Sequence, residues 1–393
     1  MSKFKFSALI SAICMMSVVF SGWVGFSQSP QPAVRLTTEP PVSQILPFEA
    51  EATRLQSPVQ LTLQTVDRLG KPLENAKIHL TILTPPKNPW FTTDFPIVEG
   101  TKLLEMEAQA SRGELQFQQM LPIRGTYKLL VDVTPNVANA FTPFQQTLTL
   151  AVPENWVKYR NFGILAVILL GVGLGGGWVI GGRQPVKPGE VAPRRVRLLL
   201  SGATVVAIAA LLGVNISAEI AQSGMSMPMS HMTKHESQAN NSGVLQSQGL
   251  ELRVSGDVSA TVGKPTNLQV KVTDNQANQP ATDVILNIKT TQMEHEWVAF
   301  AYQGVPDVAG QLTWQQQFFD GAPHKVEVEV SPQKSAVHQF LPFRVKREIE
   351  VEGVAPPLTV RLTGLAYFTG IVVIGLLTGL ALQHRPSLRG RWG

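Results

Sequence analysis

The stretch QLTLQTVDRLGKPLENAKIHLTILTP, residues 60–85, has a counterpart later in the chain, NLQVKVTDNQANQPATDVILNIKTTQ, residues 267–292. In both stretches apolar side chains alternate with polar ones on either side of a turn, which runs from Asp67 to Pro72 in the first and from Asp274 to Pro280 in the second. Alternation with a period of two is typical of strands that bury one face. Each stretch therefore predicts two half-buried strands joined by a turn.

The similarity continues beyond these strands, because Gly113–Pro135, GELQFQQMLPIRGTYKLLVDVTP, matches Gly310–Pro332, GQLTWQQQFFDGAPHKVEVEVSP. A fixed order of features that occurs twice indicates a duplicated structural unit. Short alternating runs separated by turns favour antiparallel sheets stacked as a sandwich of about 100 residues. We predict an all-β fold class for the exported part, with two immunoglobulin-like sandwiches at residues 28–158 and 249–358, plus transmembrane α-helices.

The composition agrees with a protein that is partly embedded in lipid. Charged residues make up 16% of the 393 residues and hydrophobic ones 44%, as expected when several segments lie in a bilayer. The single cysteine, Cys14, lies in the first apolar run, so the rest of the chain holds neither disulfides nor thiolate metal ligands. Basic residues gather beside apolar runs, which indicates membrane orientation and no nucleic-acid partner.

Four apolar runs are candidates for targeting or membrane insertion. Residues 1–27 carry Lys3 and Lys5 before an uncharged run, as a signal peptide or an uncleaved signal anchor does, and either would export the first sandwich. Because a helix needs about 20 residues to cross the hydrocarbon core, we predict transmembrane helices at 162–182, 198–218 and 362–383.

Two basic clusters predict the orientation of these spans. The loop 183–197 contains five basic residues against one acid, Glu190, and the tail 384–393 contains only basic charges. The positive-inside rule places both in the cytoplasm. Both sandwiches are then expected on the exported side, periplasmic or lumenal, of a multi-pass membrane protein. The cluster residues are Arg183, Lys187, Arg194, Arg195 and Arg197 in the loop, and Arg385, Arg389 and Arg391 in the tail.

Glycines repeat at intervals of four in the predicted spans, at 171 and 175, at 173 and 177, and at 375 and 379. This spacing lets helix backbones approach closely in lipid. We expect the glycines to pack these helices against each other or against a partner membrane protein. No charge lies within the predicted spans, so a channel or proton relay is not expected.

The predicted linker 219–248 contains six methionines and histidines within eleven residues, in the sequence MSMPMSHMTKH. Thioether and imidazole groups on one strand suit copper, as Cu(I) or, where histidine dominates, Cu(II). The alternative is a linker without ligand role, whose methionines cover apolar surface near the membrane. The candidate ligands are Met225, Met227, Met229, His231, Met232 and His235.

The second sandwich carries a further candidate site. If residues 293–297 are extended, Met293, His295 and Trp297 face the same side, and His324, which opens a predicted strand, completes the ligand set. The first copy has Pro85 to Asn88 in the corresponding stretch and Tyr127 in place of His324. Only the second copy is therefore expected to hold metal ligands.

The order LQVKVTDNQANQPATDVILNI, QMEHEW and AGQLTWQQQFFDGAPHKVEVEV in the second copy resembles the exported domains of the YtkA-like family and, more loosely, copper-resistance sandwiches of the CopC kind. This resemblance implies an antiparallel sandwich outside the cytoplasm that handles copper, with Met293 and His295 at the family's Met and His positions. The family's domain normally stands alone, whereas this chain carries two copies and several spans.

The chain offers no catalytic motif, whether nucleophile, phosphate-binding loop or dinucleotide fingerprint, and we predict that it is not an enzyme. The first hypothesis is a membrane-anchored copper-binding protein in which the Met/His-rich segment captures the ion and the second sandwich holds it or passes it on. The alternative is a non-metal assembly subunit, whose sandwiches and glycine-rich helices bind a membrane protein complex. The oligomeric state is left open.

Overall fold

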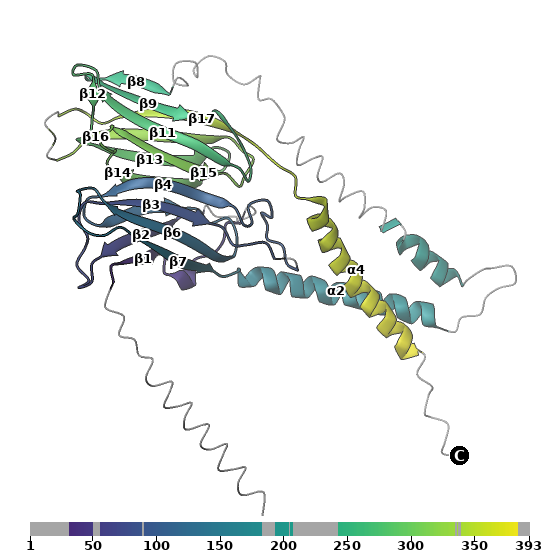
Figure 1. Cartoon of the computed structure of the whole chain (residues 1–393). Coiled ribbons are helices and arrows are strands. Elements are labelled where there is room, and N and C mark those ends of the chain that lie inside the picture. The colour runs from purple at the N-terminus through teal and green to yellow at the C-terminus, as the bar shows by residue number, and fades with distance from the viewer. Residues whose placement is uncertain are drawn as a thin grey trace, which may run out of the picture.

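The computed structural model describes residues 31–49, 56–88, 90–182, 193–203, 205–206, 243–334, 336 and 339–383 (Figure 1). Several predicted segments lie outside this part of the chain. They are the signal segment 1–27, most of the basic loop 183–197, the span 198–218 from residue 207 onward, the Met/His-rich residues 225–235 and the tail 384–393.

The first copy contains seven strands, and its alternating residues are buried as predicted. Ile78, Leu80 and Ile82 point into the core, for example, while the residues between them are partly exposed. The strands are β1 (Ala33–Glu39), β2 (Val59–Val66), β3 (Ala76–Leu83), β4 (Lys102–Ala110), β5 (Glu114–Gln119), β6 (Gly125–Pro135) and β7 (Phe144–Val152), with a 3-10 turn η1 at Val42–Gln44.

The second copy repeats this order with three additional short strands, β8, β10 and β12. Its strands are β8 (Val244–Ser247), β9 (Leu250–Gly256), β10 (Ser259–Thr261), β11 (Pro265–Asp274), β12 (Gln279–Pro280), β13 (Val284–Gln292), β14 (Val298–Gly304), β15 (Gln311–Gln317), β16 (His324–Pro332) and β17 (Phe343–Glu352). Stacked sheets that are antiparallel except for the short β10–β17 pair make up both copies, which confirms the predicted fold class.

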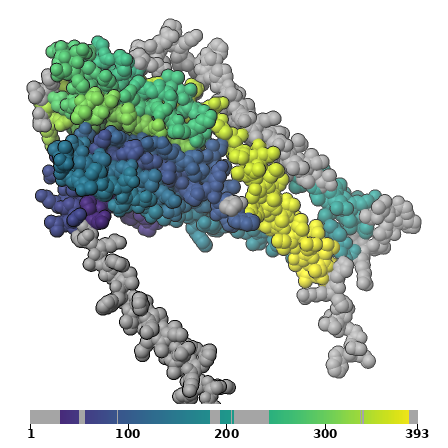
Figure 2. Space-filling model, viewed as in Figure 1, coloured from purple at the N-terminus to yellow at the C-terminus, as the bar shows by residue number. Residues whose placement is uncertain are grey.

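The two copies share both of their sheets. One sheet has the order β1-β2-β5-β14-β13-β16-β17-β10 and the other β7-β6-β3-β4-β15-β11-β9-β8. Each sheet therefore continues from the first copy into the second, because β5 pairs with β14 in one sheet and β4 pairs with β15 in the other. We call these two pairs the seams. Figure 2 shows the two copies in contact as one body, with α4 leaving it at one end.

The seams are equivalent to each other. Strand β4 has the same place in the first copy as β14 has in the second, and β5 the same place as β15. Each seam aligns three residue pairs, Met106 with Trp314 in one and Phe117 with Tyr302 in the other among them. A contact in which each partner offers the same surface is that of a twofold dimer. The chain thus contains an internal pseudo-dimer of sandwiches.

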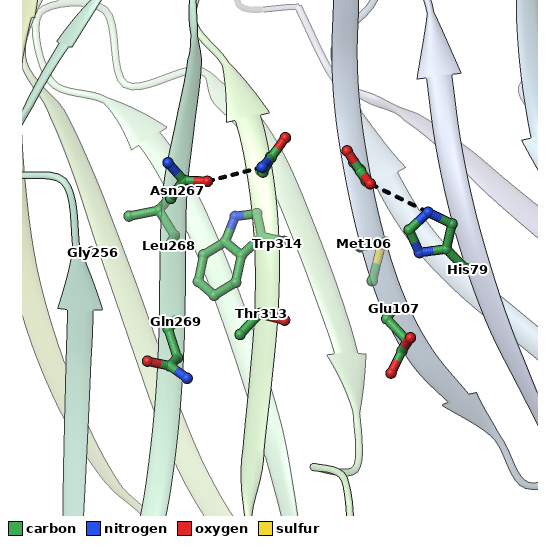
Figure 3. Close-up of a pocket in the computed structure, with 11 residues that line it drawn as sticks. His79, Met106, Glu107, Gly256, Asn267, Leu268, Gln269, Thr313 and Trp314 are labelled. Atoms are coloured by element: carbon green, nitrogen blue, oxygen red, sulfur yellow. Dashed lines mark hydrogen bonds and ion pairs between the residues drawn. The ribbon is translucent and has the colours of Figure 1, made fainter.

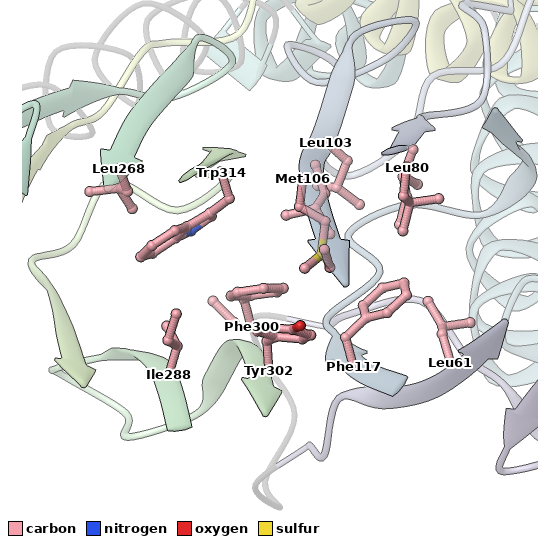
Figure 4. Packing of buried hydrophobic residues seen from close by; sticks show 14 of the residues in the cluster. Leu61, Leu80, Leu103, Met106, Phe117, Leu268, Ile288, Phe300, Tyr302 and Trp314 are labelled. Carbon is pink, nitrogen blue, oxygen red and sulfur yellow. The ribbon is translucent and has the colours of Figure 1, made fainter. Parts of the chain in front are cut away.

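One hydrophobic core runs through both copies (Figure 4). At the seams Phe117, Phe300 and Trp314 are fully or almost fully buried, and the rings of Phe300 and Trp314 stack with centroids 6.3 Å apart. Burying a large aromatic side chain stabilises a fold by about 1.5–3 kcal/mol. Because these side chains lie between the copies, their burial stabilises both copies together.

Two long apolar helices come after the last main strand of each copy, α2 (Trp156–Gly181) after β7 and α4 (Leu358–Gln383) after β17. Each has 26 residues and contains a long apolar stretch, so both are long and apolar enough to cross a membrane. They overlap the predicted spans 162–182 and 362–383. Residues 194–203, which include the start of the predicted span 198–218, are also helical, and Leu199 lies near Gly176 of α2.

The helices α2 and α4 cross at their glycines and run parallel. A Cβ at Gly173 would lie 2.2 Å from the carbonyl oxygen of Val372, and one at Gly375 would lie 2.4 Å from that of Leu170. Gly177 and Gly379 make the corresponding approaches one turn later. Gly173 and Gly375 occupy the same position in their helices, as do Gly177 and Gly379. The predicted close packing is confirmed for these four glycines, and it repeats the pseudo-twofold relation of the sandwiches, whereas Gly171 and Gly175 have no described neighbour within 4 Å of an added Cβ.

Candidate functional site

The structure describes three of the nine predicted copper ligands, Met293, His295 and His324. The other six, Met225, Met227, Met229, His231, Met232 and His235, lie outside the described residues. The three described residues lie at the end of the second copy from which α4 leaves, because His324 pairs with Ile349 near the end of β17 and the N–H of Met293 donates to the carbonyl of Pro323.

Residues 293–295 form a turn, so the prediction of an extended stretch is wrong. Strand β13 ends at Gln292, and Glu296 takes a left-handed backbone with φ of 58°, which reverses the chain. Met293 and His295 are consequently exposed, Met293 by 42%, whereas Trp297 is 3% exposed and faces the core. Met293, His295 and Trp297 do not share a face.

The turn is attached to the sandwich through Gln292. The side-chain oxygen of Gln292 accepts a hydrogen bond from the backbone N–H of His295 at 2.6 Å, and its side-chain nitrogen donates to Asp320 at 3.2 Å. Burial raises the pKa of Asp320, and the negative charge of Glu294 raises it further. These contacts account for the position of His295 without a ligand.

His324 is a buried side chain at the start of β16. Its Nδ1 lies 2.7 Å from the carbonyl oxygen of Ala322, and its ring packs against Phe318 and Trp297 with centroid distances of 4.5 and 5.6 Å. Burial lowers the pKa of His324 to about 4, so the imidazole is neutral near pH 7 and donates from Nδ1 to that carbonyl. Its Nε2 is buried without a hydrogen-bond partner among the described atoms.

Tyr127 occupies the position of His324 in the first copy, as the repeat indicates, because Pro135 and Pro332 end β6 and β16 at the same point of the register. The hydroxyl of Tyr127 donates to the carbonyl of Ile123 at 2.7 Å and accepts from the N–H of Ile123 at 3.0 Å. In both copies a buried polar ring therefore bonds to the backbone just before the strand, a structural role that needs no metal.

The described candidates do not form a metal site together. The thioether of Met293 is exposed, whereas the imidazole of His324 is buried among aromatic rings, so the two do not converge. Among the described residues no group of three or more His, Cys, Asp or Glu side chains is arranged to hold a metal ion. The sandwich part of the copper hypothesis thus receives no support from this geometry.

A row of hydrogen-bonded polar side chains crosses one seam on the outer face of the nine-stranded sheet. Several of them line a shallow pocket of about 450 Å³ (Figure 3). Gln315 donates to Asn267 at 2.9 Å and accepts from Lys102 at 3.0 Å, and Lys102 pairs with Glu105. The row ends at His79, whose Nε2 lies 3.3 Å from Glu105. These bonds connect β11, β15, β4 and β3 across the two copies, and the shallow polar surface is part of the seam.

A larger pocket of about 600 Å³ lies at the membrane-proximal end of the first copy. Its walls come from the β3–β4 connection, the start of β6 and the first turn of α2, where Tyr159 lines it. Inside, Arg124 pairs with Glu154 and donates to the carbonyl of Thr92 at 3.2 Å. We call this the juxtamembrane pocket.

Comparison with known proteins does not assign a family. No family model matches the chain, and no curated protein matches it. Solved structures with partial likeness include Escherichia coli alpha-2-macroglobulin (10% identity, TM-score 0.22, 82% of this chain and 16% of that one), the Yersinia pseudotuberculosis adhesin InvE (13%, 0.19, 82% and 61%) and PorU from Porphyromonas gingivalis (10%, 0.23, 84% and 25%). The chain thus spans less than two thirds of each of these proteins, and likeness at these scores carries no functional assignment.

An aromatic cluster that no sequence pattern indicates joins the copies beside His324. Phe48 and Phe95 of the first copy pack against Trp297 and Phe319 of the second, with centroid distances of 4.8 Å for Phe48–Trp297 and 5.4 Å for Phe95–Phe319. Trp297 therefore contacts the other copy and does not face a ligand site. Phe48 and Phe95 lie in irregular segments, where no periodicity indicates burial.

Proposed function

We propose that this chain is a membrane-anchored assembly subunit, whose fused sandwiches lie on the exported side and whose helix pair packs with a partner membrane protein. The observation that carries the proposal is the repeated twofold relation, in which seams and glycine crossing hold the two copies as one body. Such a body is suited to presenting fixed surfaces to a partner.

A glycine face of α2 supports the choice of partner. Cβ atoms added at Gly171 and Gly175 would have no described atom within 4 Å, whereas Gly173 and Gly177 face α4. Small residues four apart are the usual contact between helices in lipid. The face with Gly171 and Gly175 is therefore assigned to a partner helix.

The test is the size of the tagged chain's complex, extracted from its native membrane in mild detergent and separated by native electrophoresis. Gly171→Ile with Gly175→Ile should shift the complex to the size of the free chain. Gly163→Ile, at another open position of α2, is the matched control and should leave the size unchanged. A wild-type chain that migrates as a monomer would overturn the proposal.

The proposed orientation is tested by labelling single cysteines in a Cys14→Ser background. Lys289 is exposed on the second copy, and Arg195 lies in the basic segment before the predicted span 198–218. A membrane-impermeant maleimide should label Lys289→Cys in spheroplasts or right-side-out vesicles, and Arg195→Cys only after the membrane is opened. The reverse pattern would show that the sandwiches are cytoplasmic.

Copper capture by residues 225–235 is a second candidate function, favoured by six soft or intermediate ligands within that segment. Since Met293, His295 and His324 do not converge, the segment alone would bind the ion. Titration of the full chain in detergent with Cu(I) should show stoichiometric binding, and replacement of all six residues by Ser should abolish it. His295→Ala should leave the affinity unchanged, and binding that survives the six replacements would exclude capture by this segment.

A further inference from the structure

We propose that the juxtamembrane pocket binds the headgroup of an ethanolamine phospholipid, with the ammonium group at Glu99 and the phosphodiester at Arg124. The inference goes beyond the assembly role and rests only on the part of that proposal which inserts α2 and α4 in a membrane. It names a ligand class for a pocket that the sequence did not reveal.

The position of the pocket is the first argument. Phe91, which lines it, stacks on Tyr367 of α4 with centroids 6.4 Å apart and planes 8° from parallel, and the hydroxyl of Tyr367 donates to the carbonyl of Trp90 at 2.8 Å. Trp90 is 68% exposed and Phe91 64%, and Trp156 and Tyr159 of α2 are also exposed. Exposed aromatic side chains beside the start of membrane helices are enriched at headgroup depth. The pocket therefore opens where lipid headgroups lie.

A buried carboxylate supplies the recognition of a cation. Glu99 lines the pocket and is only 6% exposed. Its Oε1 accepts hydrogen bonds from the N–H and the hydroxyl of Thr93 at 2.9 and 2.7 Å, while its Oε2 has no hydrogen-bond partner among the described residues. This oxygen is not among the enclosed, unpaired side-chain atoms, so it is open to the pocket, and an ammonium group there can donate a charge-assisted hydrogen bond to it.

The remaining lining residues fit the rest of the headgroup. A guanidinium carries five N–H donors, and Arg124 uses two of its nitrogens on Glu154 and Thr92, which leaves donors for a phosphate oxygen. Tyr159 lines the rim, and an aromatic ring there can contribute a cation–π contact to a bound ammonium group. A headgroup with only negative charge would meet Glu99 and Glu154, and a choline headgroup has no N–H to donate. An ethanolamine headgroup has both an ammonium group that can donate to Glu99 and a phosphodiester that can accept from Arg124.

The second copy lacks the wall of this pocket. Between β3 and β4 the first copy has residues 84–101, which carry Trp90, Phe91, Thr93 and Glu99, whereas the equivalent connection between β13 and β14 is the short turn 293–297. The long connection is thus an addition to one copy of a duplicated unit, at the end that faces the membrane. Its length is not needed to connect two adjacent strands, since the second copy manages with five residues.

The experiment measures lipid retained by the full chain in detergent, by native mass spectrometry, after incubation with dioleoyl phosphatidylethanolamine, phosphatidylcholine or phosphatidylglycerol. Retention of the ethanolamine lipid should exceed the other two by about tenfold, since a site built to hydrogen-bond a donor rejects analogues that lack it. Equal retention of the three lipids would overturn the proposal.

Two variants localise the binding. Glu99→Gln should lower the preference for the ethanolamine lipid to near that for the choline lipid, and Tyr159→Leu at the exposed rim should weaken retention by about threefold. Glu107→Gln, an exposed carboxylate on the outer face of β4, is the matched control and should retain the wild-type preference. A wild-type preference in both Glu99→Gln and Tyr159→Leu would exclude this pocket.

Free phosphoethanolamine separates the lipid from its headgroup. It should compete for the site only at far higher concentration than the lipid, because it lacks the acyl chains that hold a lipid beside α2. Competition at equal concentration would exclude the membrane as the source of the ligand. The size of the native complex does not enter this measurement, so failure here leaves the assembly proposal standing, and the reverse also holds.

Discussion

The crossing of α2 and α4 gives the sharpest prediction, because its geometry fixes the size of the perturbation. Gly173→Ala and Gly177→Ala add methyl groups that would lie 2.2 and 2.1 Å from the carbonyl oxygens of Val372 and Leu376. Ordinary contacts begin near 3.4 Å, so the helices must separate by more than 1 Å. Overpacking costs about 1–3 kcal/mol per site. The double variant should weaken the pairing by about 2–6 kcal/mol, at least about thirtyfold.

A disulfide at the far end of the helices reports this separation. A Cβ at Gly181 would lie 3.1 Å from the Cβ of Gln383, close to the distance of about 3.5–4.5 Å that a disulfide spans. In a Cys14→Ser background, Gly181→Cys with Gln383→Cys should therefore cross-link quickly under mild oxidation. The rate is measured as the growing fraction of chain whose cysteines no longer react with a polymer-linked maleimide, which is seen as the loss of a gel shift.

The matched control lies two residues earlier on the same helix. Gly171→Ala with Gly175→Ala makes the same chemical change at the same spacing, on a face with no described atom within 4 Å. Its cross-linking rate should equal that of the parent. The rate with Gly173→Ala and Gly177→Ala should fall by at least about tenfold, allowing for the tether that the sandwiches provide. Equal rates in the two double variants would refute the crossing.

Three further predictions concern the sandwiches. Burial lowers the pKa of His324 from 6.5 to about 4, so on acidification the unfolded state binds the proton first, and the free energy of unfolding should fall between about pH 6.5 and 4 by at most about 3 kcal/mol. His324→Phe should remove this part of the pH dependence, measured by urea unfolding, and an unchanged profile would contradict the burial of His324. Phe300→Ala, at a fully buried seam position, should cost about 3–5 kcal/mol and speed global hydrogen exchange in β2 and β11 alike, whereas an effect confined to β11 would show two independent domains. The second copy alone, residues 243–357, should self-associate during gel filtration because the edges of β14 and β15 lose their partners; a stable monomer would argue against the shared sheets.

The strands of this fold were predictable because period-two alternation is a local signal. Ile78, Leu80 and Ile82 are buried as their spacing indicates. The seams were not predictable, because alternation tells which face of a strand is buried and does not tell which strand covers it. Met106 and Trp314 have the pattern of ordinary core residues, and the edges that join them use backbone hydrogen bonds common to all strands.

The candidate site was harder to predict for a different reason. The alternation of apolar and polar residues gives no sign that β13 ends at Gln292, whereas in the structure a turn closed by the backbone hydrogen bond from Gln292 to Trp297 and the positive φ of Glu296 end the strand there. The juxtamembrane pocket combines Glu99, Arg124 and Tyr159 from three separate elements. No spacing in the sequence brings such residues together, because their proximity depends on the long β3–β4 connection folding back toward α2.

The two pseudo-twofold contacts stabilise each other, and this coupling bears on how a partner could act. Only residues 153–155 separate β7 from α2, and residues 353–357 separate β17 from α4. Because the connections are short, the helices have a high effective concentration for each other once the seams have formed. In the same way, helices that have crossed raise the effective concentration of the two copies for each other and so favour the seams. A partner helix that displaced α4 from Gly173 would therefore weaken the seams, whereas one that binds at Gly171 and Gly175 would leave both contacts intact. If the chain joins a complex as proposed, the open glycine face is therefore the one that leaves its own fold intact.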